Sequence, residues 1–204
     1  MRGDQPQVFL LDIDNTLIDH DELKRQVAAW IDDRVVQPRS GEFWETYEAV
    51  RRELGIVDFM EAARRFEDLC GPEPLDGLGR FLWGFPFDDL LLPGTRPGWE
   101  RLAQTGPLAV LCDGERRFQE QKLERIGLLP LLEHVFVFDH KEDHLGEVER
   151  RFPGANFVMF DDKPRILRAM EQRLGPRLPA VHVRHGHYAG EAFAGRSVDS
   201  IAAY

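Results

Sequence analysis

The stretch that decides the fold is VFLLDIDNTLID, residues 8–19. Its first four residues are all apolar, which is too short a run for a helix but typical of a strand covered on both faces, as in a parallel sheet. Two aspartates, Asp12 and Asp14, follow directly at the carboxyl end of this run. The stretch therefore predicts a buried strand whose end carries two carboxylates, and a turn there can bring both to one cavity.

Four similar apolar runs follow, LAVLC, VFVF, FVMF and AVHV, at residues 108–112, 135–138, 157–160 and 180–183. Helical patterns with ordinary ends lie between some of them. One follows Gly114 and closes at Gly127, and another opens at Pro164 and ends before Gly175. Strands that alternate with helices predict an α/β fold, a doubly wound parallel sheet.

The interval between the first two apolar runs is about a hundred residues long, far more than a simple crossover needs. Apolar residues recur along it at helical spacing in four groups, at 23–35, 43–54, 59–70 and 78–85. We therefore expect a small domain of about four helices, residues 19–94, inserted into a core made of residues 1–18 and 95–204.

Composition excludes several classes of protein. The 204 residues are 43% hydrophobic and carry a formal net charge of −10, so the chain can bury a core and lacks the basic character of nucleic-acid binders. No apolar run reaches the roughly 18 residues of a membrane-spanning helix. The start, MRGDQPQ, lacks the apolar middle of a secretory signal, and two cysteines make no disulfide framework. We expect a cytoplasmic protein.

Lysine is rare in this chain, with four residues against 22 arginines. Arginine therefore supplies most of the positive surface charge. Because a compact ammonium and a planar guanidinium are not interchangeable, each lysine is a candidate for a chemical role. The four are Lys24, Lys122, Lys141 and Lys163.

Four of the five apolar runs end directly at an aspartate. In open parallel sheets, ligands bind at the carboxyl ends of the strands, near the point where the strand order reverses. Acidic side chains gathered along that edge are typical of a metal site. The four residues are Asp12, Asp113, Asp139 and Asp161.

Residues 8–19 resemble motif one of the haloacid dehalogenase superfamily, in its phosphatase form. The segment LAVLCDG, 108–114, is similar to motif two, Lys141 after VFVFDH resembles motif three, and Asp161-Asp162 resembles motif four. The resemblance covers essentially the whole chain, and the helical insertion is similar to a cap placed after the first strand. It implies a Rossmann-like core with a small α-helical cap.

The resemblance also implies an activity, the Mg²⁺-dependent hydrolysis of a small phosphorylated metabolite through an aspartyl-phosphate. In that scheme Asp12 is the nucleophile, Asp14 the general acid and base, and Lys141 the group that stabilises charge. Mg²⁺ would be held by Asp12, Asp161, Asp162 and the backbone carbonyl of Asp14. Such an enzyme takes a small-molecule phosphate ester as its partner.

Motif two departs from the family pattern, because Cys112 stands where Ser or Thr is usual. A thiol is a weak hydrogen-bond donor, so its hold on a phosphoryl oxygen is reduced. The backbone N–H groups of Asp113 and Gly114 could donate instead. Packing of Cys112 against the sheet is the alternative interpretation.

Lys122 competes with Lys141 for the role of motif three. We prefer Lys141, because Lys122 falls in the middle of an amphipathic helical pattern, where a solvated face is expected. Similarly, we interpret His140 and His144 as surface residues rather than metal ligands. The segment HGHY, 185–188, follows the last apolar run and either borders the site or is a plain loop.

Other functions remain open on the same fold. A haloacid dehalogenase shares the nucleophile but uses no metal and lacks the second aspartate, so Asp14 argues against it. A phosphonate hydrolase would need a lysine from the cap that forms a Schiff base, and Lys24 is the one cap lysine. A non-catalytic phosphate-binding domain is favoured by Cys112 and disfavoured by Asp12, Asp14 and Asp161.

Overall fold

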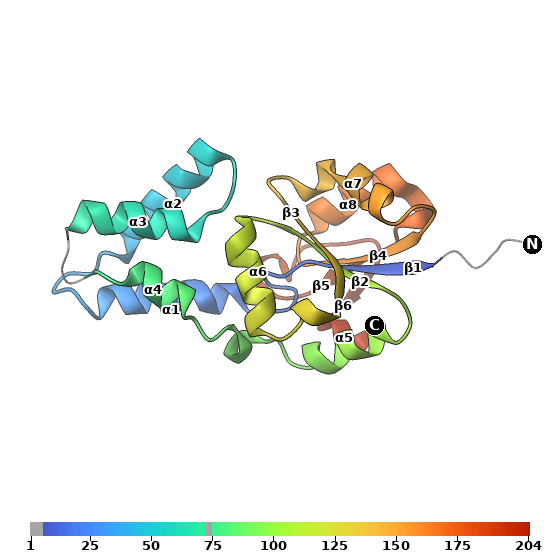
Figure 1. The fold of residues 1–204 in the computed structure, drawn as a ribbon, viewed down its shortest axis with the longest axis horizontal. Coiled ribbons are helices and arrows are strands. Elements are labelled where there is room, and N and C mark those ends of the chain that lie inside the picture. Colours follow the sequence, from blue (N-terminus) through green and yellow to red (C-terminus); the bar gives the residue numbers. More distant parts are fainter. Residues whose placement is uncertain (1–5, 72–74) are drawn as a thin grey trace, which may run out of the picture.

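The computed structural model describes residues 6–71 and 75–204 (Figure 1). Residues 1–5, part of the start that argues against a secretory signal, lie outside the described residues. One parallel sheet has the strand order β3-β2-β1-β4-β5-β6. The strands are β1 Gln7–Leu11, β2 Leu108–Asp113, β3 Leu132–Phe138, β4 Asn156–Asp161, β5 Ala180–Val183 and β6 Arg196–Val198. The predicted doubly wound parallel sheet is confirmed.

Helices cover both faces of the sheet, with α7 and α8 on one side and α5 on the other (Figure 1). Alternate residues of β1 serve the two faces, since Val8 and Leu10 pack with α7 and α8, whereas Phe9 and Leu11 belong to the cluster that includes α5 and α6. Burial of each such side chain contributes about 1.5–3 kcal/mol. The apolar run of β1 is unbroken because the side chains on both faces of the strand are buried in the core. The helices are α5 Thr95–Ala103, α6 Arg116–Arg125, α7 Leu145–Arg151 and α8 Pro164–Leu174.

Helix α6, which later contributes to the site, begins at a side-chain cap. The Glu115 carboxylate accepts hydrogen bonds from the backbone N–H groups of Arg117 and Phe118, at 2.9 and 2.8 Å. The segment closes at Gly127, which has a φ of 74°. These two features fix where α6 begins and where the segment after it turns.

Among the described residues, helices α1 to α4 occupy the first part of the long interval between β1 and β2, ahead of α5, and they lie at the left in Figure 1. Asp19 caps the first of them, accepting the N–H of Glu22 at 2.7 Å. Their apolar faces join the cluster that also contains Phe9 and Leu11 of β1. Leu54, expected on such a face, is 45% exposed because α2 ends there. The helices are α1 His20–Asp32, α2 Ser40–Leu54, α3 Phe59–Cys70 and α4 Leu78–Trp83.

The apolar runs missed parts of the fold. Strand β6 has only three residues, Arg-Ser-Val, and lies at the edge of the sheet beside β5. It therefore contains no apolar run. Strand β3 begins at Leu132 rather than residue 135, and its first half is partly exposed because it forms the other edge. Apolar runs identify buried strands and underestimate edge strands.

Candidate active site

The strand order reverses between β1 and β4, where the chain crosses from one half of the sheet to the other. Leu11 of β1 is paired with Phe160 of β4, and the backbone N–H of Asp12 donates to the Phe160 carbonyl at 3.0 Å. Asp161 is the last residue of β4. The two aspartates therefore lie side by side at the switch point, where ligands of such sheets bind.

Three carboxylates gather at this point. Asp12, Asp161 and Asp162 each offer an oxygen within 4.8 Å of the others, and all three residues are buried. Burial and the neighbouring carboxylates raise the pKa of Asp162 to about 8. Burial, against the effect of Lys141, raises the pKa of Asp12 to about 6. Oδ1 of Asp162 has no hydrogen-bond partner among the described residues. A hard divalent cation suits this set of oxygens.

Lys141 supplies positive charge to the cluster. Its Nζ lies 2.5 Å from Asp12 Oδ1 and 2.6 Å from Asp161 Oδ2, and the side chain is fully buried. Burial opposes the charge, but Asp12, Asp161 and Asp113 outweigh it and raise the pKa of Lys141 well above its usual range. The backbone N–H of Lys141 donates to Asp113 Oδ1 at 2.8 Å. Lys141 is therefore a fixed ammonium against the Asp12 carboxylate.

The Asp14 carboxylate faces different partners. Lys122 Nζ donates to both of its oxygens, at 2.7 and 3.0 Å, and Nδ1 of His20 lies 3.2 Å from Oδ1. Gln119, also on α6, donates to Oδ2 at 3.3 Å. Burial raises the pKa of Asp14, but His20 and Lys122 outweigh it, and the pKa lies well below its usual range. Asp14 is thus held as a carboxylate, and its side chain is outside the three-carboxylate cluster.

The expectation that Lys122 lies on a solvated face is wrong. Its side chain is 1% exposed and pairs with Asp14. The side chains of Gln119 and Gln121, on the same helix, are also buried. The amphipathic pattern misled because it treats every polar residue of a helix as solvated. The rarity of lysine was the signal that could have found it.

A turn built by Asn15 directly follows the two aspartates. Asn15 has a φ of 58°, in the left-handed region, and its Oδ1 accepts the backbone N–H groups of His20 and Asp21 at 2.9 and 3.3 Å. Thr16 Oγ1 donates to Asp12 Oδ2 at 3.3 Å. The side chains of Asn15, Thr16 and His20 therefore orient the site, and motif spacing alone did not identify these functions.

The motif-two residues do not form an open phosphate cradle. Cys112 is 1% exposed, and its Sγ donates to the Phe136 carbonyl at 3.7 Å, so the thiol packs in the core. The backbone N–H of Gly114, expected as a phosphate donor, already donates to the Phe138 carbonyl at 3.0 Å. Asp113 does reach the site, where its carboxylate accepts the N–H of Lys141.

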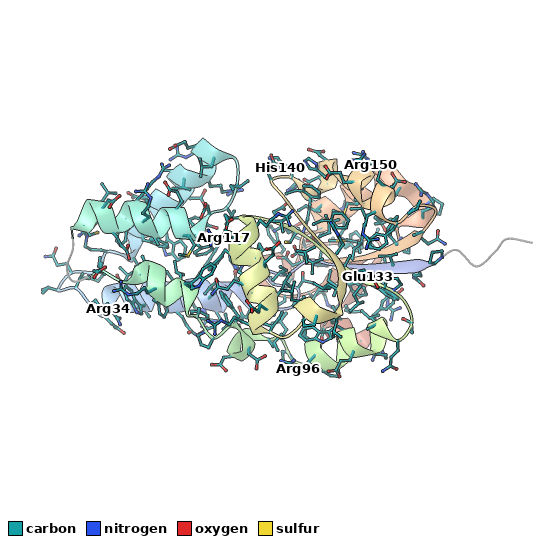
Figure 2. The ribbon with its side chains drawn as sticks, viewed as in Figure 1. Arg34, Arg96, Arg117, Glu133, His140 and Arg150 are labelled. Carbon is teal, nitrogen blue, oxygen red and sulfur yellow. The ribbon has the colours of Figure 1, made fainter. Side chains whose placement is uncertain are left out.

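A cavity of about 180 Å³ lies over this edge of the sheet. Its core side includes Asp14, Asp113, Asp162 and Lys163. Side chains of α1 and α2 form another part of its wall, together with the loop after β5. These are Lys24, Tyr47, Glu48, Arg51, His187 and Tyr188. The segment 185–188 therefore borders the site. A larger groove of about 520 Å³ lies at α3, α4 and the start of α6, beside Arg117 (Figure 2), and holds none of the predicted site residues.

The other sequence candidates lie outside the cluster. Asp139 follows the edge strand β3, is exposed, and lies 3.4 Å from His144 Nε2. His140 is exposed at the end of that strand (Figure 2). An aspartate at an edge strand is too far along the sheet to join those of the central strands, so three of the four strand-end aspartates reach the site.

The lysines lie closer to the site than most of the arginines, although Arg51 also lines the cavity. Arg34, Arg96 and Arg150 lie at the periphery of the molecule (Figure 2) and are exposed. All four lysines, in contrast, line the cavity or contact its aspartates. The lysines are therefore placed where a chemical role is open to them, and that role stays a prediction.

A family model for haloacid dehalogenase-like hydrolases matches residues 6–183. The chain belongs to this family. A solved structure described as a haloacid dehalogenase-like hydrolase, from Burkholderia xenovorans, is 35% identical, with a TM-score of 0.85 over 98% of this chain and 97% of that one. The predicted family is therefore confirmed.

More distant solved structures share the fold. The HAD-hydrolase YfnB from Bacillus subtilis, bound to magnesium, is 16% identical with a TM-score of 0.64, over 97% of this chain and 96% of that chain. The L-2-haloacid dehalogenase from Xanthobacter autotrophicus is 14% identical with a TM-score of 0.62, over 96% and 95%. No curated protein matches significantly. Within residues 6–71 and 75–204, no helix has the length and apolar character that crossing a bilayer requires.

The position of Cys112 predicts a cost in stability for Cys112→Ser. A buried hydroxyl with a shorter reach than the thiol loses its hold on the Phe136 carbonyl, so we expect a loss of about 1–3 kcal/mol in the free energy of unfolding. Urea unfolding of the wild type, Cys112→Ser and Cys112→Ala measures this loss. A stability equal to that of the wild type would place the side chain outside the core.

The raised pKa values of Asp12 and Asp162 predict how stability depends on pH without metal. The native state binds protons on these carboxyls more tightly than the unfolded state, so stability falls as pH rises from about 4 to about 8. The melting temperature of chelator-treated protein should fall over that range, and less steeply for Asp162→Asn. Asp89→Asn, an exposed control, should keep the wild-type slope. An unchanged slope for Asp162→Asn would contradict the assignment.

Proposed function

We propose that the chain is a Mg²⁺-dependent phosphatase that hydrolyses a small phosphomonoester through an aspartyl-phosphate on Asp12. One observation carries the proposal, namely that two aspartates two residues apart have opposite surroundings. Asp12 lies in a buried carboxylate cluster against Lys141, whereas Asp14 lies outside it against Lys122. A nucleophile and a separate proton carrier need such a division. In this proposal, residues 19–94 are a cap over a core of 1–18 and 95–204.

The residues present fit Mg²⁺. The carboxylates of Asp12, Asp161 and Asp162 would hold it together with the backbone carbonyl of Asp14, and Asp162 Oδ1 has no hydrogen-bond partner among the described residues. Oxygen donors of this kind are the ligands that Mg²⁺ prefers. When bound, the ion neutralises charge on the phosphoryl oxygens. Even with Lys141 beside it, the cluster keeps the pKa values of Asp12 and Asp162 above their usual range, so a further cation is consistent with its chemistry.

In the first half-reaction a carboxylate oxygen of Asp12 forms a bond to phosphorus while the bond to the ester oxygen breaks. Lys141, held against Asp12, steadies the nucleophile and the phosphoryl charge. Thr16 Oγ1 on Asp12 Oδ2 fixes the plane of the carboxylate. In the second half-reaction water attacks the same phosphorus and releases Asp12 and inorganic phosphate.

Asp14 moves the proton. In its resting form, a carboxylate held by Lys122, it can take a proton from the attacking water in the second half-reaction. In the first, it must give a proton to the departing oxygen, so it has to acquire one beforehand. A phosphate dianion bound beside Asp14 favours that uptake, because nearby negative charge raises the pKa of a carboxyl.

The alternatives differ in what they require. A haloacid dehalogenase needs neither metal nor Asp14, a phosphonate hydrolase needs an imine on a cap lysine, and a binding domain needs no turnover. Lys24 lies at the cavity, so the second alternative has a residue to use. The Lys122–Asp14 pair has a purpose in the phosphatase and none in the dehalogenase, and this favours the phosphatase.

A screen of several dozen phosphomonoesters, with Mg²⁺ and with excess chelator, tests the proposal. We expect hydrolysis with Mg²⁺, poor support by Ca²⁺, which prefers longer bonds and more ligands, and none with chelator. Asp12→Asn should lose at least about a thousandfold in kcat because an amide is not a competent nucleophile, while its circular dichroism stays that of the wild type. Dehalogenation in the presence of chelator would replace the phosphatase by the first alternative.

Leaving groups test the role of Asp14. Asp14→Asn should lower kcat/KM for an alkyl phosphate by about 10²–10⁴ and much less for nitrophenyl phosphate, whose leaving group needs no proton. Lys122→Met should show the same dependence on the leaving group, since it releases Asp14 from its position. Arg117→Met, on the same helix but exposed, is the control. Equal losses for both esters would remove Asp14 from proton transfer.

A further inference from the structure

Lys24 differs from the other three lysines in its ion pairing. Lys122 pairs with Asp14, Lys141 with Asp12, and Lys163 lies 4.0 Å from Asp162. In the described part of the chain, Lys24 has no carboxylate within ion-pairing distance, although it lines the same cavity. Its Nζ lies 6.0 Å from the centre of the Tyr47 ring, which is buried. A positive charge without a partner therefore faces the cavity from α1.

The other charges on this wall are already matched. Arg51 lies 3.4 Å from Glu48, and both are on α2. This chain uses arginine for its surface charge, so an unpaired lysine at the cavity has a chemistry that arginine does not supply. Lys24 is therefore the cation available to a ligand.

Helix geometry gives the position of this charge relative to the reaction. His20 and Lys24 are four residues apart on α1 and share one face. His20 contacts Asp14, the proposed donor to the ester oxygen. One helical turn further, a rise of about 6 Å, reaches Lys24. A leaving group that starts at Asp14 and extends past His20 therefore approaches the face of α1 that carries Lys24.

We propose that the substrate is a small phosphomonoester whose leaving group carries a second anionic group, a carboxylate in particular, and that Lys24 binds this group. The inference rests on the proposed phosphatase function and names its substrate class. The cavity of about 180 Å³ suits a leaving group of a few carbon atoms. Lys24 would then be a specificity residue, since an ion pair formed with the substrate distinguishes it from a neutral ester.

Two esters of equal size test this proposal, 2-carboxyethyl phosphate and its neutral isostere 3-methylbutyl phosphate, both with Mg²⁺. We expect the wild type to prefer the carboxylate by about tenfold or more in kcat/KM, the effect of one hydrogen bond to a charged group. Lys24→Met should remove this preference. Lys24→Arg, which keeps the charge but cannot form an imine, should retain most of it. Arg25→Met is the matched control, because Arg25 is the next residue, is 70% exposed and pairs with Glu22.

The outcomes separate this inference from the proposed function. Equal kcat/KM for the two esters, or a preference that survives Lys24→Met, overturns the inference and leaves the phosphatase standing. A Lys24→Arg variant as poor as Lys24→Met would show that the amine rather than its charge is needed, and would also overturn it. If no phosphomonoester of the wider screen is hydrolysed, the proposed function itself fails.

Discussion

The repulsion among three buried carboxylates is the interaction on which the site depends. Asp12, Asp161 and Asp162 are brought within 4.8 Å by neighbouring parallel strands, and all three are buried. Such an arrangement is costly unless cations accompany it. Lys141 supplies one charge from a short helix after β3, and the apolar sheet underneath prevents the carboxylates from moving apart.

A second ion pair stands beside the first and is separate from it. Lys122 reaches Asp14 from α6, and its Nζ lies 6.0 and 5.1 Å from the centres of the Phe87 and Phe118 rings. The turn at Asn15 follows both aspartates and holds the start of α1, which carries His20, beside Asp14. Two aspartates of identical chemistry thereby acquire different pKa values, one raised and one lowered, because their surroundings differ. The proposed two-step phosphoryl transfer uses this difference, because it needs one aspartate as nucleophile and another as proton carrier.

Particular elements explain how far the sequence could be interpreted. Strands β1, β2, β4 and β5 were predictable because both of their faces are buried, which leaves an unbroken apolar run. Strand β6 was not, since an edge strand of three residues is stabilised by its pairing with β5 rather than by its composition. The prediction for Lys122 was wrong because helical periodicity shows only which side of a helix is polar. It does not show whether that side faces water or, as here, a partly buried carboxylate, that of Asp14.

By itself, the sequence determined the parallel α/β sheet, the family, and the strand ends that bear Asp12 and Asp161. Those features are local, since apolar runs and the residues directly after them are neighbours along the chain. Only the tertiary structure decided which lysine meets which aspartate, that the thiol of Cys112 lies in the core, and that Lys24 and Tyr47 border the cavity. The physical reason is that these contacts join residues far apart in sequence, and their energies depend on burial and charge, which exist only once the chain has folded.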